Sequence, residues 1–90
     1  MENPDPLLRR ARALRLAILE ELANTPALYL QPERALVASL QLSLCPPPSA
    51  QEVQEALDRL EADALIHCEV DSLRGKRWCM TSLGKATLRF

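Results

Sequence analysis

Four residues of this chain have side chains that commonly bind transition metals. His67 is the single histidine, and Cys45, Cys68 and Cys79 are the three cysteines. His67 and Cys79 could stand across a hairpin from each other, but a zinc site needs four nitrogen or sulfur ligands, or three and a water. Cys45, the only spare thiol, is distant in sequence. We therefore expect no metal site. An odd number of cysteines without a C-x-x-C spacing favours a reduced, cytoplasmic environment.

Catalytic arrangements are equally hard to build from this sequence. Two glycines in ninety residues leave little material for a loop that wraps a phosphate in backbone N–H groups. The sequence has no nucleophile elbow and no pair of acidic residues with a hydrophobic shield. We therefore expect no enzymatic activity, no cofactor and no small-molecule substrate. Arg15, Glu20 and Glu21 interrupt the apolar run "ALRLAILEELA", so we expect neither a signal peptide nor a membrane span.

The remaining candidate chemistry is electrostatic and centres on the segment "DSLRGKRWCM". Arg74, Lys76 and Arg77 surround a glycine in a turn, where cations could contact phosphates or could simply keep an edge hairpin soluble. Residues 66–90 hold two acids and five bases, a net charge of +3. Residues 49–65 hold five acids and one base, Arg59, a net charge of −4. The chain is therefore bipolar, although its overall net charge is only −1.

The elements that would position these groups begin with an amphipathic helix from Asp5-Pro6 to about Asn24. One apolar stripe recurs at three- and four-residue spacing and consists of Leu7, Ala11, Leu14, Ile18 and Leu22. Further leucines lie round the helix, so it is apolar over more than one face. Either a small domain leaves some of them exposed, or they form the face of a homodimer or contact a protein partner. The residues of this predicted face are Leu8, Leu16 and Leu19.

A short strand and two more helices follow. The apolar residues 27–30, between two prolines, predict a brief strand or an extended connector. The second helix starts at Pro32 and must end before the three prolines at 46–48. Its apolar residues at helical spacing are Leu36, Val37, Leu40 and Leu44. The third helix, residues 49–63, begins with a capping box in which Ser49 and Glu52 satisfy each other's backbone N–H groups.

The hydrophobic period then changes to two, which predicts a β-hairpin. The positions that face the core under this alternation are Ile66, Cys68, Val70, Trp78 and Met80. We expect Trp78 to pack in the core rather than to stack on a base. Thr81 would cap a closing helical turn. The residues through which that turn would pack are Leu83, Ala86 and Phe90. Residues 1–90 thus predict one domain of the α+β class, mostly helical.

The stretch "VQEALDRLEADALIHCEVDSLRGKRWCMTSLGKATL" has a recognisable pattern. A leucine-rich helix leads through an Ala-Leu-Ile step into a strand, and the second strand closes with a hydrophobe, a Thr and, three residues later, a Gly. The positions are Leu57, Leu60, Ala64, Leu65, Ile66, Met80, Thr81 and Gly84. This pattern resembles the winged helix-turn-helix domains of MarR-, ArsR- and PadR-like proteins, and the form with a proline loop is similar to small winged-helix proteins of Mu-like prophages. Those families usually have glycine at position 64. Because a left-handed alanine costs roughly 1 kcal/mol, we expect this turn to be built differently.

The resemblance implies a small DNA-binding protein of transcription-regulator type, phage-associated by the prophage likeness and dimeric through its first helix. The third helix would meet the major groove of double-stranded DNA with Ser49, Gln51, Gln54 and Arg59. The wing would contact phosphates with Arg74, Lys76 and Arg77. The acids of the third helix argue against this arrangement, because they repel the DNA backbone. The alternative hypothesis is a winged-helix domain that binds no DNA and serves as a protein-interaction or scaffolding module.

Overall fold

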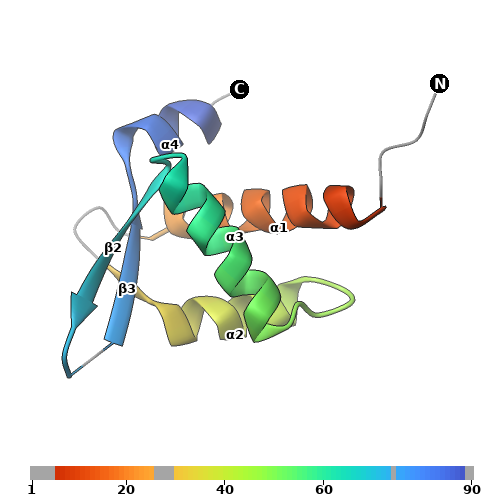
Figure 1. The fold of residues 1–90 in the computed structure, drawn as a ribbon, viewed down its shortest axis with the longest axis horizontal. Helices are drawn as coiled ribbons and strands as arrows, with labels where there is room; N and C mark the ends of the chain where they lie inside the picture. The colour runs from red at the N-terminus through yellow and green to blue at the C-terminus, as the bar shows by residue number, and fades with distance from the viewer. Residues whose placement is uncertain (1–5, 26–29, 74, 89–90) are drawn as a thin grey trace.

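The computed structural model of the chain describes residues 6–25, 30–73 and 75–88 (Figure 1). The helices in these ranges are α1 (Pro6–Ala23), α2 (Glu33–Ser43), α3 (Ala50–Ala62) and α4 (Ser82–Leu88). The strands are β1 (Gln31–Pro32), β2 (Ile66–Asp71) and β3 (Gly75–Met80). The predicted class, α+β and mostly helical, is confirmed. None of the helices in the described part is long and apolar enough to cross a membrane.

The three strands form one antiparallel sheet in the order β1-β3-β2. β2 and β3 form the predicted hairpin, in which Ile66 lies opposite Met80 and Asp71 lies opposite Gly75. β1 adds one pair of residues, Gln31 and Pro32, at the far side of β3. The short strand therefore comes later than predicted. Of the predicted span, residues 27–29 lie outside the described residues, and Leu30 belongs to no strand.

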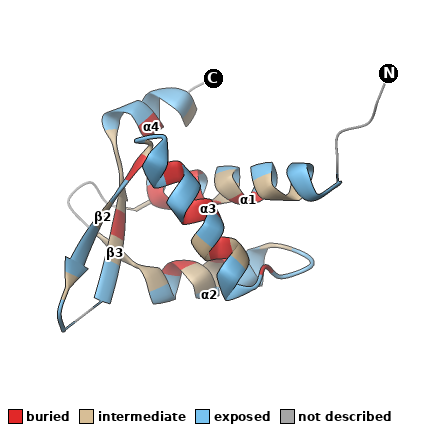
Figure 2. Ribbon diagram, viewed as in Figure 1, coloured by how far each residue is buried: buried red, intermediate tan, exposed pale blue. Residues whose placement is uncertain are grey.

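The core lies where α1, α2 and α3 meet one face of the sheet (Figure 2). Its buried residues are Leu14, Ile18, Leu19, Leu22, Leu36, Leu40, Val53, Ala56, Leu57, Leu60, Ile66 and Trp78. The prediction for Trp78 is confirmed, and the prediction for Val70 is wrong, because its side chain is 76% exposed. The hairpin extends past the helices, so the inward positions near its tip have nothing to pack against. Cys68, which lies opposite Trp78 and farther from the tip, is half-buried and packs against the core.

The wide apolar surface of α1 is explained by its position in the fold. α1 contacts α2, α3, α4 and β3, so it is packed from more than one side. Leu19 is consequently buried, with 6% of its surface exposed, and its predicted place on a dimer face is wrong. Leu16 remains 50% exposed and Leu8 is exposed to a similar degree. Only these two residues of the predicted face are accessible.

The end of α3 is tied to the start of α4. Ala64 adopts a left-handed backbone with φ of 61°, so the expectation that this turn avoids that conformation is wrong. The turn is held because the Leu65 N–H donates to the Leu60 carbonyl at 3.0 Å, and the Thr81 hydroxyl donates to the Ala64 carbonyl at 2.7 Å. Thr81 also accepts from the Gly84 N–H at 3.1 Å, which confirms its role as a cap.

α4 packs differently from the prediction. Leu83 and Ala86 are exposed, and Phe90 lies outside the described residues. The helix instead contacts the rest of the fold through Gly84, which is buried, and Leu88, which packs against the core. The absence of a side chain at Gly84 allows the backbone of α4 to approach the Leu65 carbonyl closely.

Candidate functional site

The polar residues predicted to read bases from α3 are hydrogen-bonded to acids of the same helix. Gln51 Nε2 donates to Glu55 at 3.3 Å, and Gln54 Nε2 donates to Asp58 at 2.9 Å. Arg59 Nε donates to Asp63 at 3.1 Å, in an ion pair one helical turn apart. The outer face of α3 therefore presents carboxylates, and three of its four predicted DNA contacts are engaged with them.

Ser49, the fourth predicted contact, serves to cap α3. Its hydroxyl accepts from the Glu52 N–H at 3.1 Å, and the Glu52 carboxylate accepts from the Ser49 N–H at 3.1 Å. The predicted capping box is thus confirmed. The Ser49 hydroxyl oxygen is therefore used in the cap, while its O–H donor makes no hydrogen bond in the described part of the chain.

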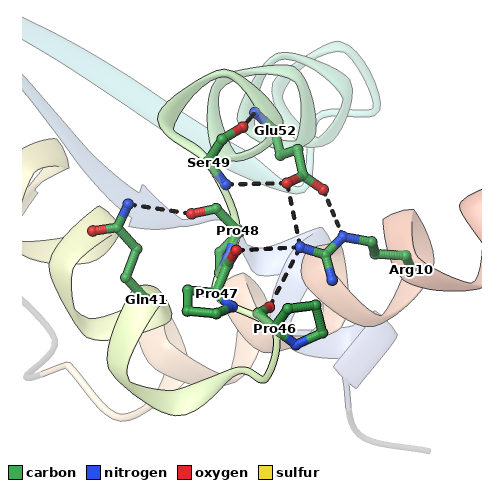
Figure 3. A network of polar contacts seen from close by, with 7 residues as sticks. All are labelled: Arg10, Gln41, Pro46, Pro47, Pro48, Ser49 and Glu52. Atoms are coloured by element: carbon green, nitrogen blue, oxygen red, sulfur yellow. Dashed lines mark hydrogen bonds and ion pairs between the residues drawn. The ribbon is translucent and has the colours of Figure 1, made fainter.

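Arg10 joins α1 to the start of α3 and to the proline loop (Figure 3). Its Nε and Nη2 donate to the two oxygens of Glu52 at 2.7 and 3.3 Å. Nη2 also lies 3.4 Å from the carbonyl oxygens of Pro46 and Pro47, and Gln41 Nε2 donates to Pro48 at 3.2 Å. The hydrogen bond from Arg10 is the main reason why the pKa of Glu52 falls from 4.5 to about 2, with a backbone hydrogen bond from Ser49 second. Sequence reasoning missed this contact, because no local signal links residues so far apart.

The basic residues of the hairpin do not form one patch. Strand alternation places Lys76 on the face that Trp78 shares and Arg77 on the opposite face. Arg77 lies opposite Glu69 and next to Pro32, is half-buried, and has a buried Nε without a hydrogen-bond partner in the described part of the chain. Lys76 is exposed. Arg74 lies outside the described residues, so its predicted role is left as a prediction.

Lys76 instead lines a groove with Arg34, which no sequence pattern singled out. The groove, about 690 Å³ in volume, lies between the first half of α2 and the turn of the hairpin. Arg34 and Lys76 are exposed, and neither side chain makes a hydrogen bond or ion pair with another described residue. The acid Glu33 also lines the groove, but its Oε1 accepts from Trp78 Nε1 at 3.0 Å. Two unpaired cations from α2 and β3 are thus brought together beside the hairpin.

Apolar surface accompanies these cations. Val37 and Leu73 also line the groove, the first half-buried and the second 94% exposed. Gln41 lines it as well, with its amide already donating to Pro48. We name this feature, with Arg34, Lys76, Val37 and Leu73 as its principal residues, the α2–hairpin groove. Its composition suits an anionic, partly apolar partner.

The thiols and the imidazole do not assemble into a reactive site. His67 lies opposite Cys79 in the hairpin, as predicted. The pKa of the Cys79 thiol is raised, chiefly by burial and then by the charge of Glu69, and the pKa of the Cys68 thiol is likewise raised by burial. Both thiols are therefore held in the less nucleophilic, protonated form. Among residues 6–25, 30–73 and 75–88, no group of three or more histidine, cysteine or acidic side chains could hold a metal ion.

The chain was compared with protein-family models, with curated proteins and with solved structures. None of the three comparisons finds a match.

Proposed function

We propose that the chain is a winged-helix domain that binds the phosphate backbone of double-stranded DNA with its hairpin and α2, while α3 does not read bases. The order of elements, with a short strand between α1 and α2 and a hairpin after α3, supports the winged-helix assignment. We favour phosphate contact over base readout because Gln51, Gln54 and Arg59 of α3 are already hydrogen-bonded to carboxylates.

The observation that carries this proposal is the pair of unpaired cations, Arg34 and Lys76, in the α2–hairpin groove. Exposed cations release counterions from DNA when they bind, which is the main source of sequence-independent affinity. Glu33 lines the same groove and lowers the net charge of its lining to +1. The acidic α3 opposes this attraction. We therefore expect weak binding that depends strongly on salt and little on base sequence.

The test is a fluorescence-anisotropy titration of a labelled duplex in low salt, repeated at rising salt. We expect a dissociation constant in the micromolar range, roughly 10⁻⁴ to 10⁻⁶ M as for non-specific complexes. Arg34→Ala and Lys76→Ala should each reduce the slope of log K against log salt by about 1. Arg12→Ala is the matched control, because Arg12 is exposed on α1 and does not line the groove. No binding at several hundred micromolar protein, or an equal effect of Arg12→Ala, would refute phosphate binding by this groove.

A second candidate is the protein-interaction module, which Leu8 and Leu16 favour. Both are about half exposed on α1. In this proposal α1 forms a homodimer or contacts another protein. Light scattering across a concentration series tests it. Leu16→Glu should abolish the complex, and a monomer at every concentration would remove the homodimer form of the hypothesis.

A further inference from the structure

The outer face of α3 and the α2–hairpin groove are complementary in shape and charge. Glu55, Asp58 and Glu61 follow one another at three-residue spacing along α3 and are all exposed. They form a convex acidic stripe within a segment, residues 49–65, whose net charge is −4. The groove is concave and has two unpaired cations and one acid, Glu33, so the net charge of its lining is +1. A helix ridge with carboxylates is therefore the type of surface that this groove fits.

We propose that the acidic stripe of α3 in one copy of the chain docks in the α2–hairpin groove of a second copy. Glu55 and Asp58 would face Arg34 and Lys76, and the exposed Leu73 would pack along the side of the docked helix. Both halves of the contact are present on every copy, so a second copy supplies them without any other partner. Two acidic stripes repel each other, and so do two cationic grooves. Charge therefore favours the pairing of a stripe with a groove over either of the other two pairings.

The arrangement can close on itself. α3 leads through a short turn into β2, so α3 and the hairpin are joined at one end on the same protomer (Figure 1). Two copies related by a two-fold axis would each insert α3 into the other's groove, and the same contact would form twice. Such a dimer buries four cations and the matching acids in pairs. It should therefore weaken strongly as salt screens those charges.

This dimer would also regulate the proposed DNA site, a consequence that rests on the proposed function. Arg34 and Lys76 cannot hold phosphates and the α3 carboxylates of a second copy at the same time. DNA and self-association should therefore compete. The α3 carboxylates of the second copy occupy the place of the DNA phosphates, and the dimer is therefore the form that does not bind DNA.

Sedimentation velocity over a concentration series in low salt tests the dimer directly. We expect wild-type protein to dimerise with rising concentration, and to become monomeric near 1 M salt, where the Debye length is about 3 Å. The double variants Arg34→Glu with Lys76→Glu, and Glu55→Lys with Asp58→Lys, should each lose association by at least about tenfold. All four positions are exposed, so circular dichroism should show that both variants are folded.

The decisive experiment mixes the two double variants. Each alone has a stripe and a groove of like charge, but in the mixture both contacts of the dimer are complementary. The lysine-bearing α3 meets the glutamate-bearing groove, and the unchanged acidic α3 meets the unchanged cationic groove. We expect a heterodimer in the mixture and monomers in the separate samples. A mixture that stays monomeric overturns the proposal, as does wild-type protein that stays monomeric at several hundred micromolar in low salt.

The matched control is Arg9→Glu with Arg12→Glu, which changes the net charge equally at two exposed positions of α1. Loss of association in this control, with none in the groove variant, would place the dimer on α1 and overturn the docking proposal. A duplex titration of the same samples separates the two proposals. Dimerisation without DNA binding would refute the proposed function alone, and DNA binding by a protein that never dimerises would refute the docking alone. A dimer that persists when the duplex is bound would refute the competition.

Discussion

Arg10 on α1 donates from Nε to Glu52 on α3 at 2.7 Å, although 42 positions separate the two residues in sequence. The same carboxylate accepts the backbone N–H of Ser49, so one acidic group both caps α3 and attaches it to α1. The guanidinium meanwhile lies against two carbonyls of the proline loop. Three segments, the N-terminal helix, the loop and the start of α3, are therefore positioned through a single arginine–glutamate pair.

This pair predicts a specific loss of stability in acid. The pKa of Glu52 is lowered to about 2 because Arg10 donates to its charged form, so folding favours the ionised carboxylate. The stabilisation is complete above the ordinary pKa of 4.5 and disappears as the pH falls through 2. Wild-type protein should therefore lose more urea resistance than Glu52→Gln between these two pH values. Glu55→Gln, which leaves the Arg10–Glu52 pair intact, should behave like wild type. Parallel pH curves for wild type and Glu52→Gln would contradict this assignment.

Replacing Ala64 with glycine should stabilise the fold. Ala64 has a φ of 61°, and a left-handed backbone costs a residue with a Cβ about 1–2 kcal/mol. Glycine removes this cost but adds flexibility to the unfolded chain, so we expect a net gain of about 0.5–1 kcal/mol in the free energy of unfolding. Chemical denaturation measures the change. Ala62→Gly, at an exposed position in regular helix geometry, should instead destabilise by a similar amount. Changes of the same sign at both positions would argue against strain at Ala64.

Gly84→Ala should destabilise for a steric reason. A Cβ at this position would collide with the Leu65 carbonyl oxygen and the Met80 side chain, which requires α4 to move away from the sheet. We expect a loss of about 1–3 kcal/mol, measured by thermal or denaturant unfolding.

The other glycine provides the control for that substitution. Gly75 has a φ of 76°, and a Cβ added there would meet no atom of a non-neighbouring residue within 4 Å, so its replacement strains only the backbone. Alanine at either glycine should lower the free energy of unfolding. Asparagine, which tolerates left-handed geometry, should recover much of this loss at Gly75 and none of it at Gly84. Recovery by asparagine at both positions would show that packing space at Gly84 is not limiting.

Leu19 and Leu16 give a matched pair on α1. Leu19→Ala should cost about 2–5 kcal/mol because it opens a cavity in the core. Leu16→Ala, the same change three residues earlier at a half-exposed position, should cost less than about 1.5 kcal/mol. Denaturant unfolding at low protein concentration measures both values without a contribution from self-association. Equal losses would mean that Leu16 is covered in solution.

The sequence predicted the features whose signals are local. Ser49 and Glu52 stand three residues apart, so their capping box is visible without a fold, and the alternation around Trp78 identifies its inward face. The burial of Leu19 was not predictable in this way, because it depends on how many elements surround α1. The contact of Arg10 with Glu52 and the shared groove of Arg34 and the hairpin likewise require the tertiary arrangement.

The grouping of Lys76 with Arg77 shows a different limit. The alternation that placed Trp78 inward also places Lys76 on that face and Arg77 on the other. Charge and sequence proximity suggested one basic patch, whereas strand geometry divides it. Lys76 then lines a groove with Arg34, and Arg77 lies opposite Glu69 in the strand register. The strand alternation was visible in the sequence, and it determines the faces of Lys76 and Arg77 even though both side chains are basic.

The shortness of β1 has a dynamic consequence for the hairpin. In the described sheet, β1 pairs only with Trp78 and Arg77, so the residues nearer the turn are paired on one side alone. A two-stranded ribbon without a packed face is marginally stable by itself. Amide hydrogen exchange should therefore form a gradient along β3, slowest at Trp78 and fastest toward Gly75. We therefore expect the hairpin to bend at Trp78, so that its outer end, which carries Lys76, can adjust to the surface that it contacts.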